Sequence, residues 1–167
     1  MKILHFISRV VVGVVFIFSG FVKGLDPLGM AYRIEDYFIA WNAHWMMPSA
    51  LTLSVLLCTM EFVLGVVILL NLKPKVGSLI LLGVMAFFTG LTFYDALYNP
   101  VPDCGCFGDA VKLTNWQTFY KNLVLMVFTV VLVLWSKKTK ESLNNLKSYG
   151  IAGITIIFFI SFSIYCY

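Results

Sequence analysis

Two cysteines separated by a single glycine, Cys104-Gly105-Cys106, are the residues of this sequence with the clearest chemical potential. Bridged cysteines normally have Cα atoms roughly 4.4–6.8 Å apart, so a tight bend is needed, and Gly105 allows it because it has no Cβ. A strained bridge is easily reduced, and a bridge that closes so short a loop stabilises a fold very little. The pattern therefore favours thiol–disulfide exchange with Cys104 and Cys106 as catalytic residues. A structural pair, or two free thiols, is the alternative.

Metal binding is the other chemistry that two close cysteines allow. A closed zinc site needs about four ligands, and His44 is the one further imidazole expected on the same side of the membrane. We therefore expect no metal.

The two remaining cysteines differ in their prospects. Cys166 ends the last apolar stretch, at the face expected for Cys104 and Cys106. It is a candidate resolving thiol, with a buried and unreactive cysteine as the alternative. Cys58 lies near the middle of an apolar stretch, where formation of the reactive thiolate is suppressed, so we interpret it as a packing residue.

Charged and aromatic side chains also occur near the outer ends of two apolar stretches, beside the cysteine pair. A quinone ring needs an apolar aromatic slot with a few polar groups, and this region has that mixture. An interfacial aromatic belt is the alternative interpretation. The residues that we predict to bind quinone are Tyr94, Asp95, Trp116, Tyr120 and Lys121.

Two further charges fall inside apolar stretches. Glu61 lies near the expected bilayer midplane, where a carboxylate is costly and normally has a partner or a function. Arg9 lies about four residues from the middle of the first stretch, a depth difference of roughly 6 Å. We predict an Arg9–Glu61 pair that either locks two helices together or handles protons or substrate.

The elements that must position these residues are membrane helices. The chain is 60% hydrophobic and 12% charged, whereas a soluble domain has about 25% charged residues. Stretches of roughly 20 apolar residues can span a bilayer. Five stretches qualify or nearly qualify: 4–22, 49–71, 76–98, 115–136 and 149–167. The net charge of +4 says little in such a chain, because the position of each Lys and Arg matters more than the sum. We expect membrane lipid as the surrounding partner and no nucleic acid.

The distribution of basic residues predicts the orientation. Eight Lys and Arg residues lie on the side of the N-terminus and three on the other side. The positive-inside rule then places the N-terminus in the cytoplasm and the Cys104-Gly105-Cys106 loop outside, which in a bacterial inner membrane is the periplasm.

Residues typical of helix N-termini occur in or next to both loops that are expected on the outer side. Asp26-Pro27 is a good helix start, and apolar and aromatic residues recur at helical spacing after it. We expect an amphipathic helix at about 27–46, acting as a membrane anchor or as one wall of a site for a hydrophobic substrate. Thr114 and Gln117 have the spacing of a capping box at the start of the fourth span.

Several of these motifs resemble the DoxX-like/MauE group of membrane proteins. They are Arg9, Phe18-Ser19-Gly20-Phe21-Val22-Lys23, Asp26-Pro27, Glu61 with Gly65, and Asp103-Cys104-Gly105-Cys106-Phe107-Gly108. The last motif resembles the methylamine-utilisation MauE branch most closely. The resemblance covers roughly residues 5–136. It implies a four-helix membrane bundle and a role in disulfide handling with a thioredoxin-like periplasmic partner.

We therefore expect an all-α, polytopic membrane bundle. A four-helix core occupies 1–136, with the amphipathic outer helix. A cytoplasmic basic loop follows at 137–148, and a fifth transmembrane helix at 149–167 either ends the protein or leads into an extracytoplasmic domain. The functional hypothesis is a thiol–disulfide oxidoreductase that exchanges electrons between a thioredoxin-like partner and quinone. The alternative is a non-catalytic anchor or assembly subunit. A small-molecule carrier is disfavoured, because we see no repeats or paired half-helices.

Overall fold

The computed structural model describes residues 2–101, 105, 113–136, 139 and 144–166, and these form an all-α protein. The helices are α1 (Lys2–Leu25), α2 (Pro27–Ala40), a 3₁₀ helix (His44–Ser49), α3 (Ala50–Leu69), α4 (Pro74–Tyr98), α5 (Asn115–Ser136) and α6 (Asn145–Tyr165). Five helices are long and apolar enough to cross a membrane, namely α1, α3 with its 3₁₀ start, α4, α5 and α6. The predicted fold class and the five spans are confirmed.

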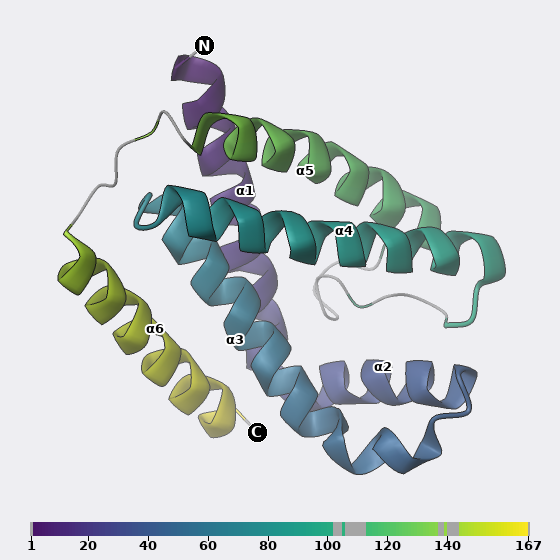
Figure 1. The fold of residues 1–167 in the computed structure, drawn as a ribbon. Helices are drawn as coiled ribbons and strands as arrows, with labels where there is room; N and C mark the ends of the chain where they lie inside the picture. The colour runs from purple at the N-terminus through teal and green to yellow at the C-terminus, as the bar shows by residue number, and fades with distance from the viewer. Residues whose placement is uncertain (1, 102–104, 106–112, 137–138, 140–143, 167) are drawn as a thin grey trace.

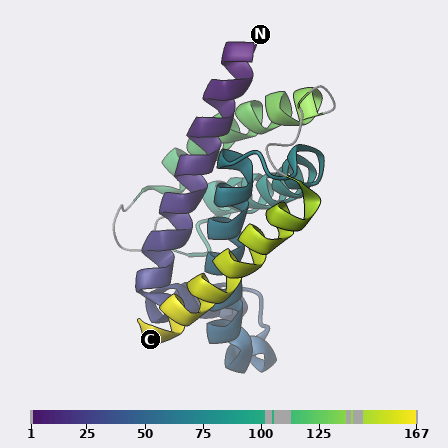
Figure 2. The same ribbon diagram turned by 90° about the vertical axis from the view of Figure 1, so that its left-hand side faces the viewer.

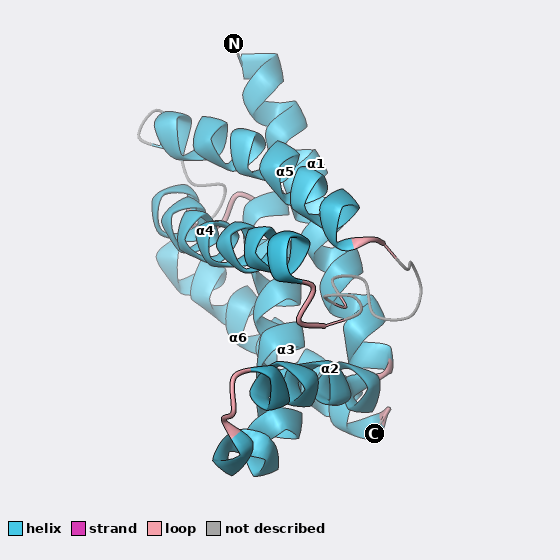
Figure 3. Ribbon diagram, turned by 90° about the vertical axis from the view of Figure 1, so that its right-hand side faces the viewer, coloured by secondary structure: helices cyan, strands magenta, loops and turns pink. Residues whose placement is uncertain are grey.

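The bundle is built from two helix pairs that cross one another (Figure 1). One pair is α1 with α3, and the other is α4 with α5. Helix α6 lies on the outside of α3 and α1 (Figure 2). Helix α2 closes one end of the bundle, below α4 and beside the start of α3 (Figure 3). The end of α1, the start of α3 and the end of the chain share that end of the bundle, whereas the N-terminus lies at the other.

Helices α1 and α3 approach each other through glycines. A Cβ on Gly20 of α1 would lie 2.6 Å from the backbone nitrogen of Phe62, and a Cβ on Gly65 of α3 would lie 2.6 Å from that of Ile17. Small residues let membrane helices pack backbone against backbone, where van der Waals contact replaces the hydrophobic effect. This contact fixes which residues of α1 face which residues of α3.

Helices α4 and α5 meet through buried polar side chains instead. The Asn122 side-chain amide donates to the Thr92 hydroxyl at 3.2 Å and to the Phe88 carbonyl at 3.4 Å. Thr118 and Thr129 are also buried along α5, and their hydroxyls donate to the carbonyls of Thr114, just before α5, and of Leu125. The capping box that opens α5 is confirmed, because the Thr114 N–H donates to Gln117 Oε1 and the Gln117 N–H donates to Thr114 Oγ1.

Helix α2 begins as predicted and ends earlier than predicted. Asp26 accepts a hydrogen bond from the Gly29 N–H at 2.8 Å, and Pro27 is the first helical residue. The predicted helix over 27–46 is wrong at its end, because α2 stops at Ala40 and Asn42 adopts a left-handed φ of 55°. A residue in this conformation terminates a helix, and the chain continues as the separate 3₁₀ helix.

Helix α6 attaches to the core through aromatic rings. Phe159 is buried and stacks on Phe62 of α3 with ring centroids 4.3 Å apart. Phe162 stacks on Phe21 of α1 at 5.6 Å. Gly24 of α1 leaves room for the Phe159 ring, since a Cβ there would lie 2.6 Å from it. Most of the remaining surface of α6 faces outward, as expected for a helix that lies against lipid.

Candidate functional site: two cavities and the loop beside them

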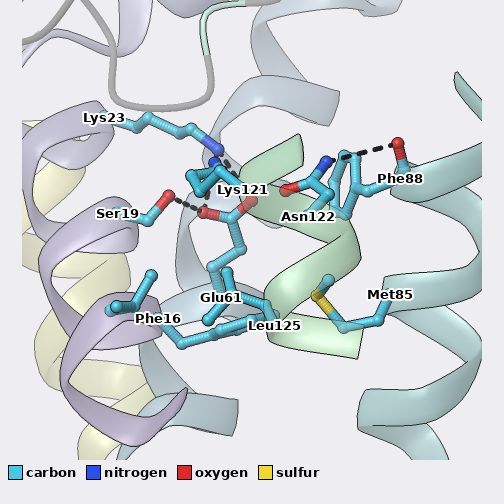
Figure 4. A pocket seen from close by; sticks show the side chains of 10 residues that line it. Phe16, Ser19, Lys23, Glu61, Met85, Phe88, Lys121, Asn122 and Leu125 are labelled. Carbon is cyan, nitrogen blue, oxygen red and sulfur yellow. Dashed lines mark hydrogen bonds and ion pairs between the residues drawn. The ribbon is translucent and has the colours of Figure 1, made fainter. Parts of the chain in front are cut away.

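A buried ion pair joins α1 to α3. Lys23 Nζ lies 2.7 Å from Glu61 Oε1 and 2.9 Å from Oε2, and the Ser19 hydroxyl donates to Oε2 at 2.8 Å (Figure 4). All three side chains are buried. The predicted Arg9–Glu61 pair is therefore wrong, because the Glu61 carboxylate forms its ion pair with Lys23 and accepts a hydrogen bond from Ser19.

Side-chain direction and helix register explain this outcome. Helical side chains lean toward the N-terminus of their own helix, so Lys23 in the last turn of α1 reaches back toward Ser19 and the bundle interior. Arg9 leans away from Glu61 for the same reason. The contact of Gly20 with α3 places Glu61 near Ser19, and Arg9 precedes Gly20 by roughly 16 Å of helix at 1.5 Å per residue.

Arg9 belongs to the other end of the bundle. Its guanidinium lies 5.4 Å from the centroid of the Phe6 ring. Together with His5, Asn71 and Ser78 it lines a small cavity of about 10 Å³ between α1, α4 and the turn after α3. Arg9 and Glu61, which the sequence pattern predicted to pair, therefore line different cavities.

The Lys23–Glu61 pair lines a polar cavity of about 30 Å³ between α1, α3, α4 and α5. Lys121 and Asn122 enter it from α5, and Phe88 closes it from α4 (Figure 4). This volume accommodates about one water molecule, and donors and an acceptor surround it. Ammonium groups, an amide, a hydroxyl and a carboxylate therefore converge in the interior of a membrane bundle.

A larger and almost entirely apolar cavity of about 210 Å³ lies between α2, α3 and α4. Helix α2 supplies Met30, Ile34, Tyr37 and Phe38, and the ring of Phe88 forms part of the α4 wall. The interpretation of the amphipathic helix as one wall of an apolar site fits this position. Ligand pockets in proteins are typically concave, mostly apolar and bordered by a few polar groups.

The five residues predicted to bind quinone do not share one site. Asp95 is fully buried and accepts a hydrogen bond from the Tyr37 hydroxyl at 2.6 Å, so α2 supplies its partner. Lys121 lines the polar cavity. The aromatic members lie on the surface: Tyr94 packs on Tyr98 at 4.9 Å, and Trp116 packs on Tyr120 at 6.0 Å. The surface rings match the interfacial belt that was the alternative interpretation.

Gly105, the residue between the two cysteines, has a described position in the structure. Cys104 and Cys106 lie outside the described residues, whereas Gly105 between them is described and buried. Gly105 has a φ of 60°, and a Cβ there would lie 3.1 Å from Arg33 Cγ and 3.7 Å from Met30 Sδ. Gly105 is therefore packed on α2, against a methionine that also lines the apolar cavity.

The two described cysteines are free thiols in different settings. Cys166 is half-buried after the end of α6, at the end of the bundle where α2 lies (Figure 1). Its role as a resolving thiol stays a prediction. Cys58 is fully buried and packs with Met30 and Phe159, in line with its interpretation as a packing residue.

Sequence reasoning missed Lys23, Ser19, Tyr37 and Asn122. Lys23 lies just beyond the first apolar stretch at 4–22, so the charge distribution places it among the three basic residues on the outer side. A signal was present, since Ser19 and Lys23 are four residues apart and share one helix face. The Tyr37–Asp95 and Asn122–Thr92 contacts join distant segments, and no local pattern indicates such partners.

Comparison with known proteins places these features in context. Residues 1–136 match the family model described as methylamine utilisation protein MauE. The chain is 29% identical over 143 residues to Protein TlpB of Flavobacterium psychrophilum. The match covers 84% of this chain and 34% of TlpB, so the chain spans about a third of the length of that relative. No solved structure matches the chain significantly.

Proposed function

This chain belongs to the MauE family, as its motifs predicted, and we propose that it is a membrane thiol–disulfide oxidoreductase. In this proposal Cys104 and Cys106 exchange electrons with an extracytoplasmic thioredoxin-like partner on one side and with a quinone on the other. The family match over residues 1–136 and the five helices that are long and apolar enough to cross a membrane support this proposal. The redox chemistry is the proposal.

The position of Gly105 is the observation that carries the proposal. Gly105 joins Cys104 to Cys106 in the chain, and it packs on Met30, which lines the apolar cavity. The residue between the two cysteines therefore lies against Met30 of α2, and Met30 lines a cavity suited to an apolar ring.

Electrons and protons balance in the proposed reaction. The Cys104 and Cys106 thiols lose two electrons and two protons when they form a disulfide. A quinone takes up two electrons and two protons and becomes a quinol. On the partner side, a thiolate of the reduced partner attacks the Cys104–Cys106 disulfide and forms a mixed disulfide. The partner's second thiol then breaks the mixed disulfide, which leaves the partner oxidised and Cys104 and Cys106 as thiols.

The apolar cavity is the proposed quinone site, in place of the surface aromatic residues. A cavity of about 210 Å³ is smaller than the pockets that enclose whole drug-sized ligands, about 300 Å³ and above. It suits a quinone ring whose isoprenoid tail extends into lipid. Trp41 also lines this cavity, so ring binding has an intrinsic fluorescent reporter.

The proposed orientation puts the N-terminus in the cytoplasm and Gly105 at the periplasmic side of a bacterial inner membrane. Support comes from Lys73 and Lys75, which flank the start of α4 at the same end as the N-terminus. Basic residues accumulate on the cytoplasmic side of membrane proteins.

Thiol trapping in native membranes tests the proposal. The redox states of Cys104 and Cys106 are followed by alkylation and mass spectrometry, with and without added quinone. The pair should become oxidised when quinone is supplied, and Cys104→Ser/Cys106→Ser should abolish partner oxidation, with Cys58→Ser as the matched control. A pair that never changes redox state, together with a double variant that behaves as the wild type, would sink the idea. Cys166→Ser tests the resolving-thiol prediction in the same assay.

A non-catalytic anchor or assembly subunit is the second candidate function. The observation in its favour is that the matched region makes up only 34% of TlpB, as expected where such a bundle carries a further domain. Co-purification separates the two candidates. A stoichiometric partner, with activity indifferent to the cysteine substitutions, favours the anchor.

A further inference from the structure

The polar cavity and the apolar cavity share one wall. Phe88 of α4 lines both of them, and its ring faces the Lys23 ammonium, with Nζ 5.9 Å from the ring centroid (Figure 4). The two cavities therefore have one side chain in common, and this side chain rotates about two torsions.

A side chain of α5 donates a hydrogen bond to the backbone of α4 at Phe88. Asn122 lines the polar cavity and donates to the Phe88 carbonyl and to the Thr92 hydroxyl, and Thr92 lines the apolar cavity. One turn of α4 thus separates the cavities, and a single amide fixes it.

The apolar cavity offers few donors to an oxygen-bearing ring: among the described residues that line it, the side chains with polar donors are Tyr37, Thr92 and Trp41. The Tyr37 hydroxyl donates to Asp95, and the Thr92 hydroxyl donates to the Phe88 carbonyl at 2.8 Å. Burying a carbonyl oxygen without a donor costs free energy. The polar cavity next to it is lined by the Lys23 and Lys121 ammonium groups, each with three N–H donors.

We infer that the polar cavity is the oxygen-binding subsite for the quinone whose ring occupies the apolar cavity, with Phe88 as the movable partition. This inference rests on the proposed function. A lysine ammonium donates to the carbonyl oxygen of the quinone. The hydroxyl of the quinol donates to the Glu61 carboxylate. The same subsite therefore offers a partner to both redox forms of the ligand.

The test uses full-length protein in lipid nanodiscs with Trp41 as the reporter, after Trp45, Trp116 and Trp135 are replaced by phenylalanine. Duroquinone is the probe, and saturable quenching of Trp41 gives its Kd. Durene has the same methylated ring without the oxygens, and its competition reports the apolar cavity alone.

The double variant Lys23→Gln/Glu61→Gln removes both charges together, so neither is left buried and unpaired. It should raise the Kd for duroquinone about tenfold, as expected for loss of a hydrogen bond to a charged group, and leave durene competition unchanged. Lys121→Gln preserves the Lys23–Glu61 pair and should raise the Kd severalfold. Lys75→Gln, at an exposed position of α4, is the matched control and should have no effect.

The outcomes separate this inference from the proposed function. Saturable quenching in the wild type, with an unchanged duroquinone Kd in both Lys23→Gln/Glu61→Gln and Lys121→Gln, overturns the oxygen-binding subsite and leaves the quinone cavity standing. No saturable quenching in the wild type overturns the quinone cavity and the subsite with it. An equal loss of duroquinone and durene binding in the folded double variant also overturns the subsite, because a specific oxygen contact would spare durene.

Discussion

The two helix pairs of this bundle are held together by different means. Helices α1 and α3 touch backbone to backbone at Gly20 and Gly65, and the buried Lys23–Glu61 pair crosses the same interface. Helices α4 and α5 meet through amide and hydroxyl groups such as those of Asn122 and Thr92. Added volume or loss of one charge should therefore destabilise the first interface strongly, whereas substitutions in the second should remove only modest hydrogen bonds. The α1–α3 interface is thus expected to be the more sensitive of the two to substitution.

The largest effect is expected from breaking the ion pair on one side. Lys23→Met leaves the Glu61 carboxylate buried without its cation, which should cost about 3–5 kcal/mol of stability. Thermal unfolding in detergent measures the loss. Arg9→Met is the matched control, because Arg9 lies far from Glu61, and it should change stability much less. Equal losses from the two substitutions would contradict the assigned partner.

Added volume at the glycine contact should have the next largest effect. Gly20→Ala places a Cβ against the α3 backbone, which cannot move as a side chain can, and should cost about 1–3 kcal/mol. Gly90→Ala on α4 meets nothing within 4 Å and should be neutral or slightly stabilising. The difference between the two variants in unfolding midpoint measures the closeness of α1 and α3. Identical midpoints would mean that the helices do not touch there.

Gly105 offers a test of the loop that joins the two cysteines. Its left-handed φ of 60° disfavours any other residue by about 1–2 kcal/mol, and its neighbour Arg33 leaves little room for a Cβ. Gly105→Ala should loosen the loop from α2 and slow oxidation of the cysteine pair by quinone, with little change in global unfolding. Unaltered oxidation kinetics would argue against the contact with α2.

The smallest effect is expected at the α4–α5 interface. Asn122→Leu removes the hydrogen bonds to Thr92 and Phe88 while filling similar space, and such bonds in membrane proteins average about 0.6 kcal/mol. The same unfolding assay should therefore register a small shift. A loss as large as that of Lys23→Met would show that the two interfaces do not differ in the way described.

The features that the sequence predicted correctly are those that depend on neighbouring residues in the chain. Helix spans follow from apolar length, the start of α2 follows from Asp26 and Pro27, and the start of α5 follows from Thr114 and Gln117. The Arg9–Glu61 pairing was wrong because it assumed a depth for each residue without the glycine register that sets one helix against the other. The five residues predicted to bind quinone do not line one cavity, because composition cannot reveal that α2 folds under α4 and encloses a cavity there.

The most direct test of the central claim is electron counting on purified, reduced protein mixed with a water-soluble quinone. Quinol formation is followed by absorbance, and the remaining thiols are counted by alkylation and assigned by mass spectrometry. The account predicts one quinol for every two thiols lost, with both losses at Cys104 and Cys106. Quinol that forms without loss of these thiols, or thiols that persist in excess quinone, would contradict it.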